Sequence, residues 1–312
     1  MVTGKTHNTL GEYELLDVLG HGGMGVVYHA RHRVTGEEVA LKVVQRKYIA
    51  TLRREAEIMG GLDHPGVLKV LDYQEGGDRA WAALELIRGA PLSLHVATCT
   101  RTCDDLDTWC TDTWLDATAA EPVVAEAATA APLHRPEPTR AALTSASRRV
   151  LGWLVQVCEA LAYVHAQGVV HLDVKPSNIL IDERSGRVVL IDFGLARRLD
   201  PGGAPLKVSR SGTSAFLSPE RLQGEATDAR ADLYAVGCML YQITTGRLPF
   251  VGSKPLGVAL QHITTPPTPP AALGVSLPLA LEGHILALLA KRPDLRPACA
   301  TLLIPTLQAT CR

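Results

Sequence analysis

The sequence predicts an α+β fold with two lobes, a small β-rich lobe followed by a larger and mainly α-helical lobe. The chain has 312 residues, enough for one large domain or two smaller ones. Its first hundred residues read as short Val-, Leu- and Tyr-rich runs separated by glycine turns. From residue 147 the apolar residues recur at helical spacing. Strands followed by helices are typical of the α+β class.

The β-rich half contains five expected strands, at 13–19, 26–32, 37–44, 67–75 and 80–87. One helix is expected to interrupt them at 51–62. Within this range Leu52, Ala56 and Met59 recur at helical spacing, and Gly60 and Gly61 stop the helix.

The helical half opens with a long amphipathic segment. Its apolar face runs from Val150 to Ala162, and Gly168 stands where a C-terminal cap belongs. Two short strand-like runs follow within 179–191. Two further helices are expected, at 231–245 and 279–290.

Residues 94–146 fit neither pattern. This Ala/Thr/Pro-rich stretch is longer than ordinary loops, so we interpret it as an insertion. His95, Cys99 and Cys103 would share a helix face there, with Cys110 beyond, and four such groups could bind zinc. The spacing matches no common zinc signature, and scattered reduced thiols explain it as well.

Charge and cysteine content narrow the class of protein. The 31 basic and 32 acidic side chains give no electrostatic footprint for nucleic acid or for an anionic membrane. The polar residues before residue 10 do not resemble a signal peptide, and no apolar stretch is suited to span a bilayer. Seven cysteines at uneven spacing are typical of reduced thiols. These features predict a cytoplasmic protein without nucleic-acid or membrane partners.

A glycine-rich turn, Gly20-x-Gly22-x-x-Gly25, is the first motif with chemical content. A dinucleotide-binding fold would need a helix to begin inside it, but the residues that follow, VVYHARH, extend as a strand. A phosphate-binding P-loop would need a Gly-Lys-Ser/Thr ending, which is missing here. A strand–turn–strand hairpin could cover phosphates with its backbone N–H groups, although an ordinary glycine hairpin has the same pattern.

Two groups of polar residues add to this motif. Lys42 ends the apolar run VALK, where a lysine needs a partner or a ligand, and Glu55 in the predicted helix is a plausible partner. Asp173, Lys175 and Asn178 come from one short loop, HLDVKPSN. Their proximity predicts a site with acid–base and cation-binding groups.

Two more motifs complete the set. Asp192 begins Asp-Phe-Gly directly after an apolar strand, which suits a carboxylate that holds a divalent cation. Ser-Pro-Glu follows at 218–220. With these five motifs in order, the sequence strongly resembles the eukaryotic-like protein kinase family. The segments GGMGVVY, RREAEIM, GTSAFLSPE and ALQHITTPP look most like bacterial serine/threonine kinases.

The resemblance implies the bilobal protein-kinase fold with one regulatory helix in the small lobe. It implies an N-terminal tail at 1–12, a catalytic domain at 13–304, and a C-terminal tail at 305–312. The N-lobe would cover 13–87 and the C-lobe 88–304. Only the insertion lies outside the resemblance.

For nucleotide binding, the resemblance implies an ATP site built from Gly20, Gly22, Gly25, Val27, Ala40, Lys42, Glu85, Ile87 and Leu180. The glycines would cover the phosphates, and Lys42, positioned by Glu55, would hold two of them. Val27, Ala40 and Leu180 would pack on adenine. The backbone of Glu85 and Ile87 would hydrogen-bond the base, next to Leu84 as gatekeeper.

For catalysis, the resemblance implies Asp173 as the base that orients the hydroxyl nucleophile and Lys175 as the cation beside the transferred phosphoryl group. Asn178 and Asp192 would be the ligands of Mg²⁺, with Mn²⁺ as a possible substitute. Lys175 within KPSN, together with Thr213, matches the serine/threonine-specific branch and protein substrates.

Three other residues match structural positions of the family. Glu220 and Arg296 would form a pair that closes the large lobe, and Asp232 would anchor the catalytic loop from a helix. Two positions depart from the pattern. Leu172 stands where the family usually has an arginine that gathers a loop phosphate, and Phe216 replaces a frequent tyrosine. Control by phosphorylation of Ser209, Ser211 or Thr213 could therefore be weak or unnecessary.

Two functions remain open at this stage. The complete set of motifs favours an active kinase, and the alternative is a pseudokinase scaffold that binds nucleotide without efficient transfer. A small-molecule kinase fits less well, because Thr213 and Ser-Pro-Glu indicate a platform for protein substrates. Similar kinases can form homodimers through the small lobe, but nothing in this sequence establishes one.

Overall fold

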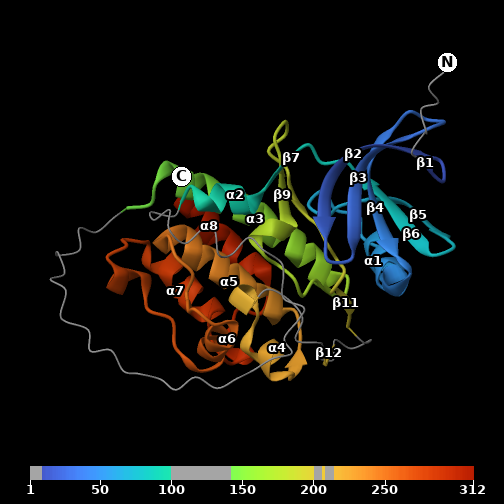
Figure 1. The fold of residues 1–312 in the computed structure, drawn as a ribbon. Helices are drawn as coiled ribbons and strands as arrows, with labels where there is room; N and C mark the ends of the chain where they lie inside the picture. Colours follow the sequence, from blue (N-terminus) through green and yellow to red (C-terminus); the bar gives the residue numbers. More distant parts are fainter. Residues whose placement is uncertain (1–8, 100–141, 200–205, 208–213) are drawn as a thin grey trace, which may run out of the picture.

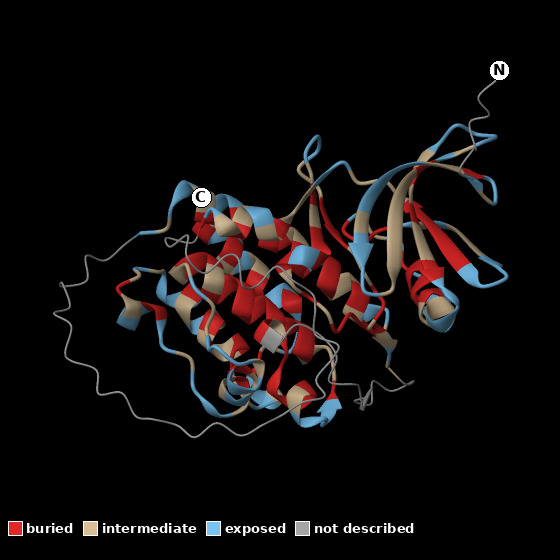
Figure 2. Cartoon of the chain, viewed as in Figure 1, coloured by how far each residue is buried: buried red, intermediate tan, exposed pale blue. Residues whose placement is uncertain are grey.

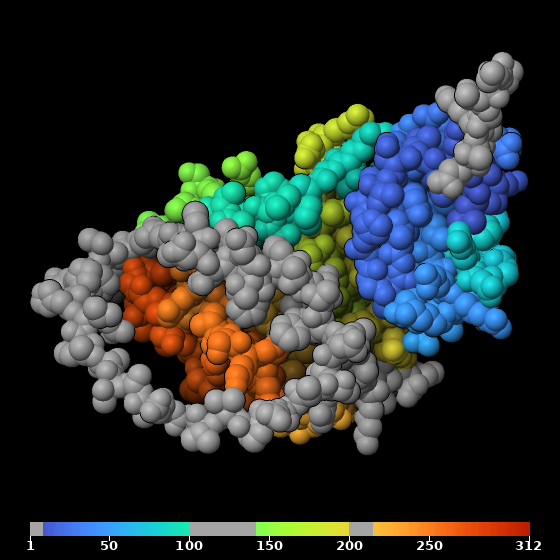
Figure 3. Space-filling model, in the orientation of Figure 1, coloured from blue at the N-terminus to red at the C-terminus, as the bar shows by residue number. Residues whose placement is uncertain are grey.

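The computed structural model describes residues 9–99, 142–199, 206–207 and 214–312. They form two lobes, with the small lobe in blue and cyan beside a larger lobe in green to red (Figure 1). The space-filling view shows the same division from the same side (Figure 3). The predicted α+β fold with a β-rich N-lobe and a helical C-lobe is confirmed.

The small lobe is built on one antiparallel sheet with the strand order β1-β2-β3-β4-β6-β5. Its strands are β1 Thr9–Leu10, β2 Tyr13–Gly22, β3 Gly25–His32, β4 Glu38–Gln45, β5 Val70–Gly76 and β6 Arg79–Glu85. Helix α1, Ile49–Gly60, packs beside the sheet through Leu52 and Met59, which are both buried. All five predicted strands and the predicted helix are present, with bounds shifted at their ends.

The large lobe is organised around two long helices, α3 Ser145–Ala166 and α5 Arg230–Thr245. Shorter helices surround them: α2 Leu92–Ala97, α4 Pro219–Gln223, α6 Pro255–Thr264, α7 Leu279–Leu288 and α8 Ile304–Cys311. The burial colouring shows α5 almost entirely red, as expected for a central helix (Figure 2). The Thr144 hydroxyl caps α3 by accepting a hydrogen bond from the Ser147 N–H at 3.0 Å, and Gly168 follows the helix with φ +68°.

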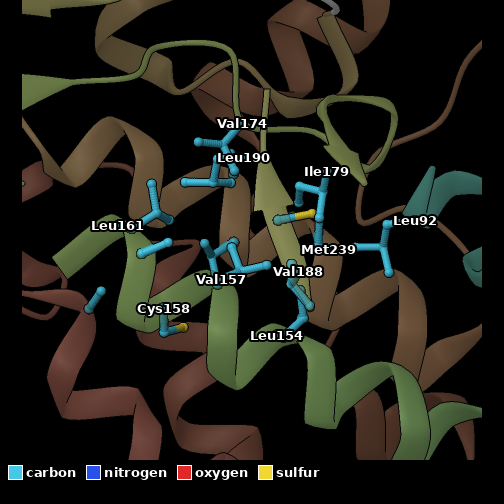
Figure 4. Close-up of a cluster of buried hydrophobic side chains, with 14 of the residues drawn as sticks. Leu92, Leu154, Val157, Cys158, Leu161, Val174, Ile179, Val188, Leu190 and Met239 are labelled. Atoms are coloured by element: carbon cyan, nitrogen blue, oxygen red, sulfur yellow. The ribbon is translucent and has the colours of Figure 1, made fainter. Parts of the chain in front are cut away.

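The large lobe also contains short strands, several of which lie toward the small lobe (Figure 1). They are β7 Gly89–Pro91, β8 Val169–Val170, β9 Ile179–Asp182, β10 Val188–Leu190, β11 Arg197–Arg198, β12 Leu206–Lys207 and β13 Ala226–Thr227. Strands β10, β9 and β7 form one small sheet, and β11 pairs with β8. In the core close-up, Leu154 and Leu161 of α3 face Val188 and Leu190 of β10, with Met239 of α5 nearby (Figure 4). This apolar contact fixes the strands that carry the polar loops of the site.

Three expected boundaries fall within or beside helices and strands of the structure. Residues 9–10 of the predicted N-terminal tail form β1, which pairs with β2. The predicted insertion at 94–146 overlaps α2 at its start, where Val96 is buried, and α3 at its end, since α3 begins at Ser145. The predicted tail at 305–312 is the helix α8, which packs on α3 through buried Leu307. Helices α2 and α8 were not predicted from the sequence, because they are short and no side chain caps them. Within the described part of the chain, none of the helices combines the length and apolarity that a bilayer span requires.

Candidate active site

The register of the small-lobe sheet places the predicted nucleotide-binding side chains on one face. Val27 of β3 lies opposite Lys42 of β4, and Ala40 lies opposite Leu84 of β6. Alternate residues of a strand point to the same side, so Ala40 and Lys42 share a face, and residues directly opposite in the ladder join them. Helix α1 packs on this same side through the cluster that contains Leu84 and Met59. The sheet therefore presents Val27, Ala40 and Lys42 together.

Lys42 is held between the two lobes by carboxylates from different elements. Its Nζ lies 2.9 and 2.8 Å from the two carboxylate oxygens of Glu55 on α1. It also lies 3.4 Å from Oδ1 of Asp192, which follows β10 in the large lobe. The prediction that Lys42 and Glu55 are partners is confirmed. The contact with Asp192 ties the pair to the other side of the interlobe region.

Electrostatics favour the charged forms of Lys42 and Asp192. Burial disfavours the Lys42 ammonium, but the charges of Glu55 and Asp192 outweigh it and raise the pKa of Lys42 above its ordinary value. Burial also opposes ionisation of Asp192, but the charge of Lys42, together with smaller favourable contributions from its surroundings, outweighs burial and lowers the pKa of this carboxyl. The Asp192 side chain is 43% exposed, so this carboxylate remains accessible.

The three predicted glycines are not equivalent in the structure. A Cβ on Gly25 would lie 2.0 Å from the Val43 carbonyl oxygen, so the pairing of β3 with β4 requires a glycine there. A Cβ on Gly20 would meet nothing within 4 Å, and one on Gly22 would meet only an ordinary contact at 3.9 Å. Neither Gly20 nor Gly22 has a positive φ. Contacts within the protein therefore do not require glycine at these two positions. Close approach of a ligand to the backbone would require it.

The connection between the lobes contains Leu84, Glu85 and Ile87. Leu84 is buried, as expected for a residue at the back of a pocket. The Glu85 N–H donates to the Lys69 carbonyl at 3.0 Å, and its carboxylate pairs with Arg187. No hydrogen bond from the Ile87 N–H is found among the described residues, so this amide is available to a ligand. Leu180 of β9 is half-buried on the large-lobe side.

The loop between β8 and β9 brings together the other predicted residues. Asn178 Nδ2 donates to Oδ2 and to the backbone carbonyl of Asp173, at 2.7 and 2.9 Å. Lys175 Nζ lies 3.3 Å from the same Oδ2 of Asp173. The expectation that these three residues converge is confirmed. Because Asn178 uses its nitrogen for Asp173, its amide oxygen remains the atom that a cation would take.

Asp232 on α5 holds this loop from below. Its two carboxylate oxygens accept the backbone N–H groups of His171 and Leu172, at 2.9 and 2.8 Å. The His165 ring also lies 2.8 Å from Asp232, and although burial opposes ionisation, the hydrogen bonds to Asp232, that of His165 foremost, help to lower the pKa of this carboxyl. The expected anchoring role of Asp232 is confirmed. Leu172 and Asp192 both have left-handed backbone, with φ of +66° and +61°, so loops at both sides of the site are strained.

The predicted pair of Glu220 and Arg296 is present deep in the large lobe. Arg296 donates to both carboxylate oxygens of Glu220, at 2.8 and 2.7 Å. Its remaining hydrogen bonds go to backbone carbonyls of Ala290, Arg230 and Lys291. All of the guanidinium nitrogens therefore have partners, and the pair fastens α4 to the end of the domain.

Some predictions lie outside the described residues. The candidate phosphorylation sites Ser209, Ser211 and Thr213 are among them, as are Cys103 and Cys110 of the zinc hypothesis. Within the described ranges, no group of three or more His, Cys, Asp and Glu side chains is arranged to hold a metal ion. The zinc hypothesis stays untested.

Arg221 also reaches the site, although the sequence did not predict it. Arg221 on α4 donates a hydrogen bond through Nη1 to the backbone carbonyl of Leu172, directly before Asp173. The signal in the sequence was weak, because an arginine after Ser-Pro-Glu in a five-residue helix has no obvious partner.

A two-lobed fold with a paired strand lysine, a polar loop and a strained Asp-Phe-Gly segment between the lobes defines the class of protein kinases. The family model described as "Protein kinase domain" matches residues 13–303, and the chain belongs to this family.

Relatives in bacteria are similar over most of the chain. A probable serine/threonine-protein kinase of Streptomyces coelicolor is 32% identical over 92% of this chain and 38% of its own length. The serine/threonine-protein kinases PknB of Mycolicibacterium smegmatis and Mycobacterium tuberculosis are 33% and 31% identical, over 91% of this chain and 40% of their own lengths. The chain thus spans about two fifths of the length of these curated relatives.

Proposed function

We propose that the chain is a serine/threonine protein kinase that transfers the γ-phosphoryl group of ATP to hydroxyls of protein substrates and of itself. The observation that carries this proposal is the contact of Lys42 with both Glu55 and Asp192, which joins the two lobes at one charged centre. A pseudokinase would have no need to keep this centre together with Asp173 and Asn178. The bacterial relatives that are named serine/threonine kinases support the same assignment.

Nucleotide binding follows from the small-lobe sheet. Val27 and Ala40, with Leu180 from the large lobe, supply apolar surfaces for adenine, and the Ile87 N–H can donate to the base. Gly20 and Gly22 leave the backbone open to the phosphates. Lys42 is charged and preorganised by Glu55, so it can hold phosphate oxygens without rearrangement.

Phosphoryl transfer needs little covalent chemistry from the protein. The substrate hydroxyl oxygen bonds to the γ-phosphorus, the bond from that phosphorus to the bridging oxygen breaks, and ADP leaves. Asp173 accepts a hydrogen bond from the hydroxyl and takes its proton. Lys175, 3.3 Å from Asp173, places a positive charge beside the oxygens of the transferred group.

The residues at the base of the site fit a divalent cation. Asp192 offers an accessible carboxylate and Asn178 an amide oxygen, and oxygen ligands are what Mg²⁺ prefers. These two residues would hold Mg²⁺, with Mn²⁺ as a substitute. When bound, the cation neutralises charge on the ATP phosphates.

The test is transfer from radiolabelled ATP to the purified chain and to a generic protein acceptor, followed by identification of the labelled amino acids. We expect label on serine or threonine. Asp173→Asn should lower the transfer rate about 10²-fold or more while ATP still binds, because it removes the base. Asp294→Asn, an exposed aspartate outside the site, is the matched control. ATP binding by the wild-type chain without any transfer would favour the scaffold alternative instead.

A further inference from the structure

Arg221 is buried in the large lobe, although it belongs to a short helix whose last residue, Gln223, is exposed. Helix α4 covers only Pro219–Gln223 and ends at Gly224, whose φ is +74°. The neighbouring Glu220 is fixed by Arg296. Arg221 itself is 4% exposed, and it extends from this anchored helix toward the loop that carries Asp173.

Arg221 contacts the peptide group between Leu172 and Asp173. Its Nη1 donates to the carbonyl of Leu172, and the N–H of that same peptide, on Asp173, donates to His171 Nδ1 at 3.2 Å. The preceding peptide is held by the Leu172 N–H, which donates to Asp232. Arg221 therefore supplies one of the three hydrogen bonds that fix the backbone around Leu172.

The backbone at this point needs such support. Leu172 adopts φ +66°, a region that a leucine rarely occupies without outside constraint. Its side chain cannot donate hydrogen bonds and lies in an apolar cluster with Val170 and Ala231. A cationic side chain that donates a hydrogen bond to this loop must therefore come from another element, and here it is Arg221 of α4.

The charges around Arg221 suit this position. Burial lowers the pKa of its guanidinium, and the carboxylates of Asp232 and Asp173 oppose that effect. An arginine remains protonated under such conditions, whereas a neutral replacement would remove one positive charge from the neighbourhood of both carboxylates. A small cavity lined by Leu172, Asp173 and Arg221 lies between α4 and the loop, so the contact is not enforced by close packing alone.

We propose that Arg221 is a positioning residue for phosphoryl transfer, which holds the Leu172–Asp173 peptide from α4 and so fixes the orientation of the Asp173 carboxylate. The proposal rests on the proposed kinase function, since it assigns Asp173 the role of base. It also couples the buried Glu220–Arg296 pair to the site, because that pair anchors the helix that carries Arg221.

The test compares Arg221→Gln, Arg221→Lys and wild type in steady-state transfer, with Arg292→Gln as the control for an exposed arginine. We expect Arg221→Gln to lower kcat about 10-fold or more and to leave KM for ATP within about twofold, because the nucleotide-binding groups are untouched. Arg221→Lys should recover part of kcat, since an ammonium can still donate to the carbonyl. In the Asp173→Asn background the substitution should have little further effect, since both changes act on one group.

Hydrogen exchange gives a readout that does not depend on activity. In Arg221→Gln the amides of residues 171–173 should exchange faster than in wild type, while those of α3 and α5 stay unchanged. The proposal would be overturned if Arg221→Gln kept the kcat and the exchange rates of wild type. It would also be overturned if nucleotide binding and thermal stability fell as much as kcat, because that result would show a merely structural role. If Arg221→Gln does not fold, the same measurements on Arg221→Lys decide. Failure of the proposed function is distinct, because then the wild-type chain itself would transfer no phosphate.

Discussion

Among the described residues, two ion pairs differ in how completely their cations are satisfied by the protein. In the large lobe, Arg296 and Glu220 have side chains that are 0% and 3% exposed, and every guanidinium nitrogen donates within the protein. Between the lobes, Lys42 meets Glu55 and Asp192, and Asp192 remains 43% exposed. The arginine pair is closed to ligands, whereas the lysine centre is open on one side.

Because of this difference in exposure, the arginine pair contributes mainly to stability and the lysine centre mainly to ligand binding. A planar guanidinium with a bidentate carboxylate fixes geometry, and removing either partner leaves an uncompensated charge in the core. An ammonium is a compact charge whose hydrogen bonds can be shared with an incoming phosphate. We therefore expect substitutions at the first pair to act on unfolding and substitutions at the second to act on transfer.

The largest expected effect is on stability at the closed pair. Arg296→Ala should lower the free energy of unfolding by about 3–5 kcal/mol, because Glu220 would stay buried without its cation. Chemical denaturation monitored by circular dichroism measures this change. Arg292→Ala, which removes an exposed partner of Asp294, should change the same quantity by less than about 1 kcal/mol. Equal effects of the two substitutions would show that burial does not distinguish these pairs.

The second effect concerns transfer at the open centre. Lys42→Met should lower kcat/KM about 10²- to 10³-fold, because it removes a preorganised positive charge at the phosphates. Its cost in unfolding free energy should be smaller than that of Arg296→Ala, since the Asp192 carboxylate at this centre remains 43% exposed. Lys69→Met, an exposed lysine of the same lobe, is the control. A larger loss of stability than in Arg296→Ala would contradict the comparison.

The stability of Lys42→Met should also depend on pH. Burial raises the pKa of the Glu55 carboxyl, and Lys42 opposes this shift, so the substitution raises that pKa further. A raised carboxyl pKa favours the folded state below the ordinary value of 4.5, and this contribution is lost as pH rises through the folded-state value. The stability gap to wild type should therefore widen between pH 4 and pH 8, measured by denaturation at each pH. A gap that narrows with pH would disprove this account of Glu55.

The smallest expected effect distinguishes two neighbouring glycines of the hairpin. Gly25→Ala should destabilise the chain by about 1–3 kcal/mol, because its Cβ would lie 2.0 Å from the Val43 oxygen and β3 would have to move. Gly23→Ala should leave stability nearly unchanged, since no atom lies within 4 Å of its Cβ position. Thermal unfolding of both variants measures the contrast. Similar melting temperatures would show that the hairpin adapts without cost.

The sequence by itself determined the order of the lobes and the strands of the sheet, and it predicted the residues of the candidate site. Local sequence patterns, such as a lysine in an apolar strand or a carboxylate at a strand end, indicate polar side chains that need a partner or a ligand. Such patterns made it possible to predict Lys42, Glu55, Asp173, Asn178 and Asp192. The pairing of Lys42 with Glu55 was also predictable, because the lysine needs an anion and the next helix offers one.

Tertiary structure alone decided the features that depend on distant contacts. Residues 92–97 and 304–311 became helices through burial against α3 and its neighbours rather than through strong caps. Gly25 differs from Gly20 because of the strand that lies beside it. Leu172 stands where the family usually has an arginine. The cation that donates a hydrogen bond to the Leu172 carbonyl is instead Arg221, 49 residues further along the chain. Local patterns record which groups a site needs, whereas folding determines which distant residue is close enough to supply them.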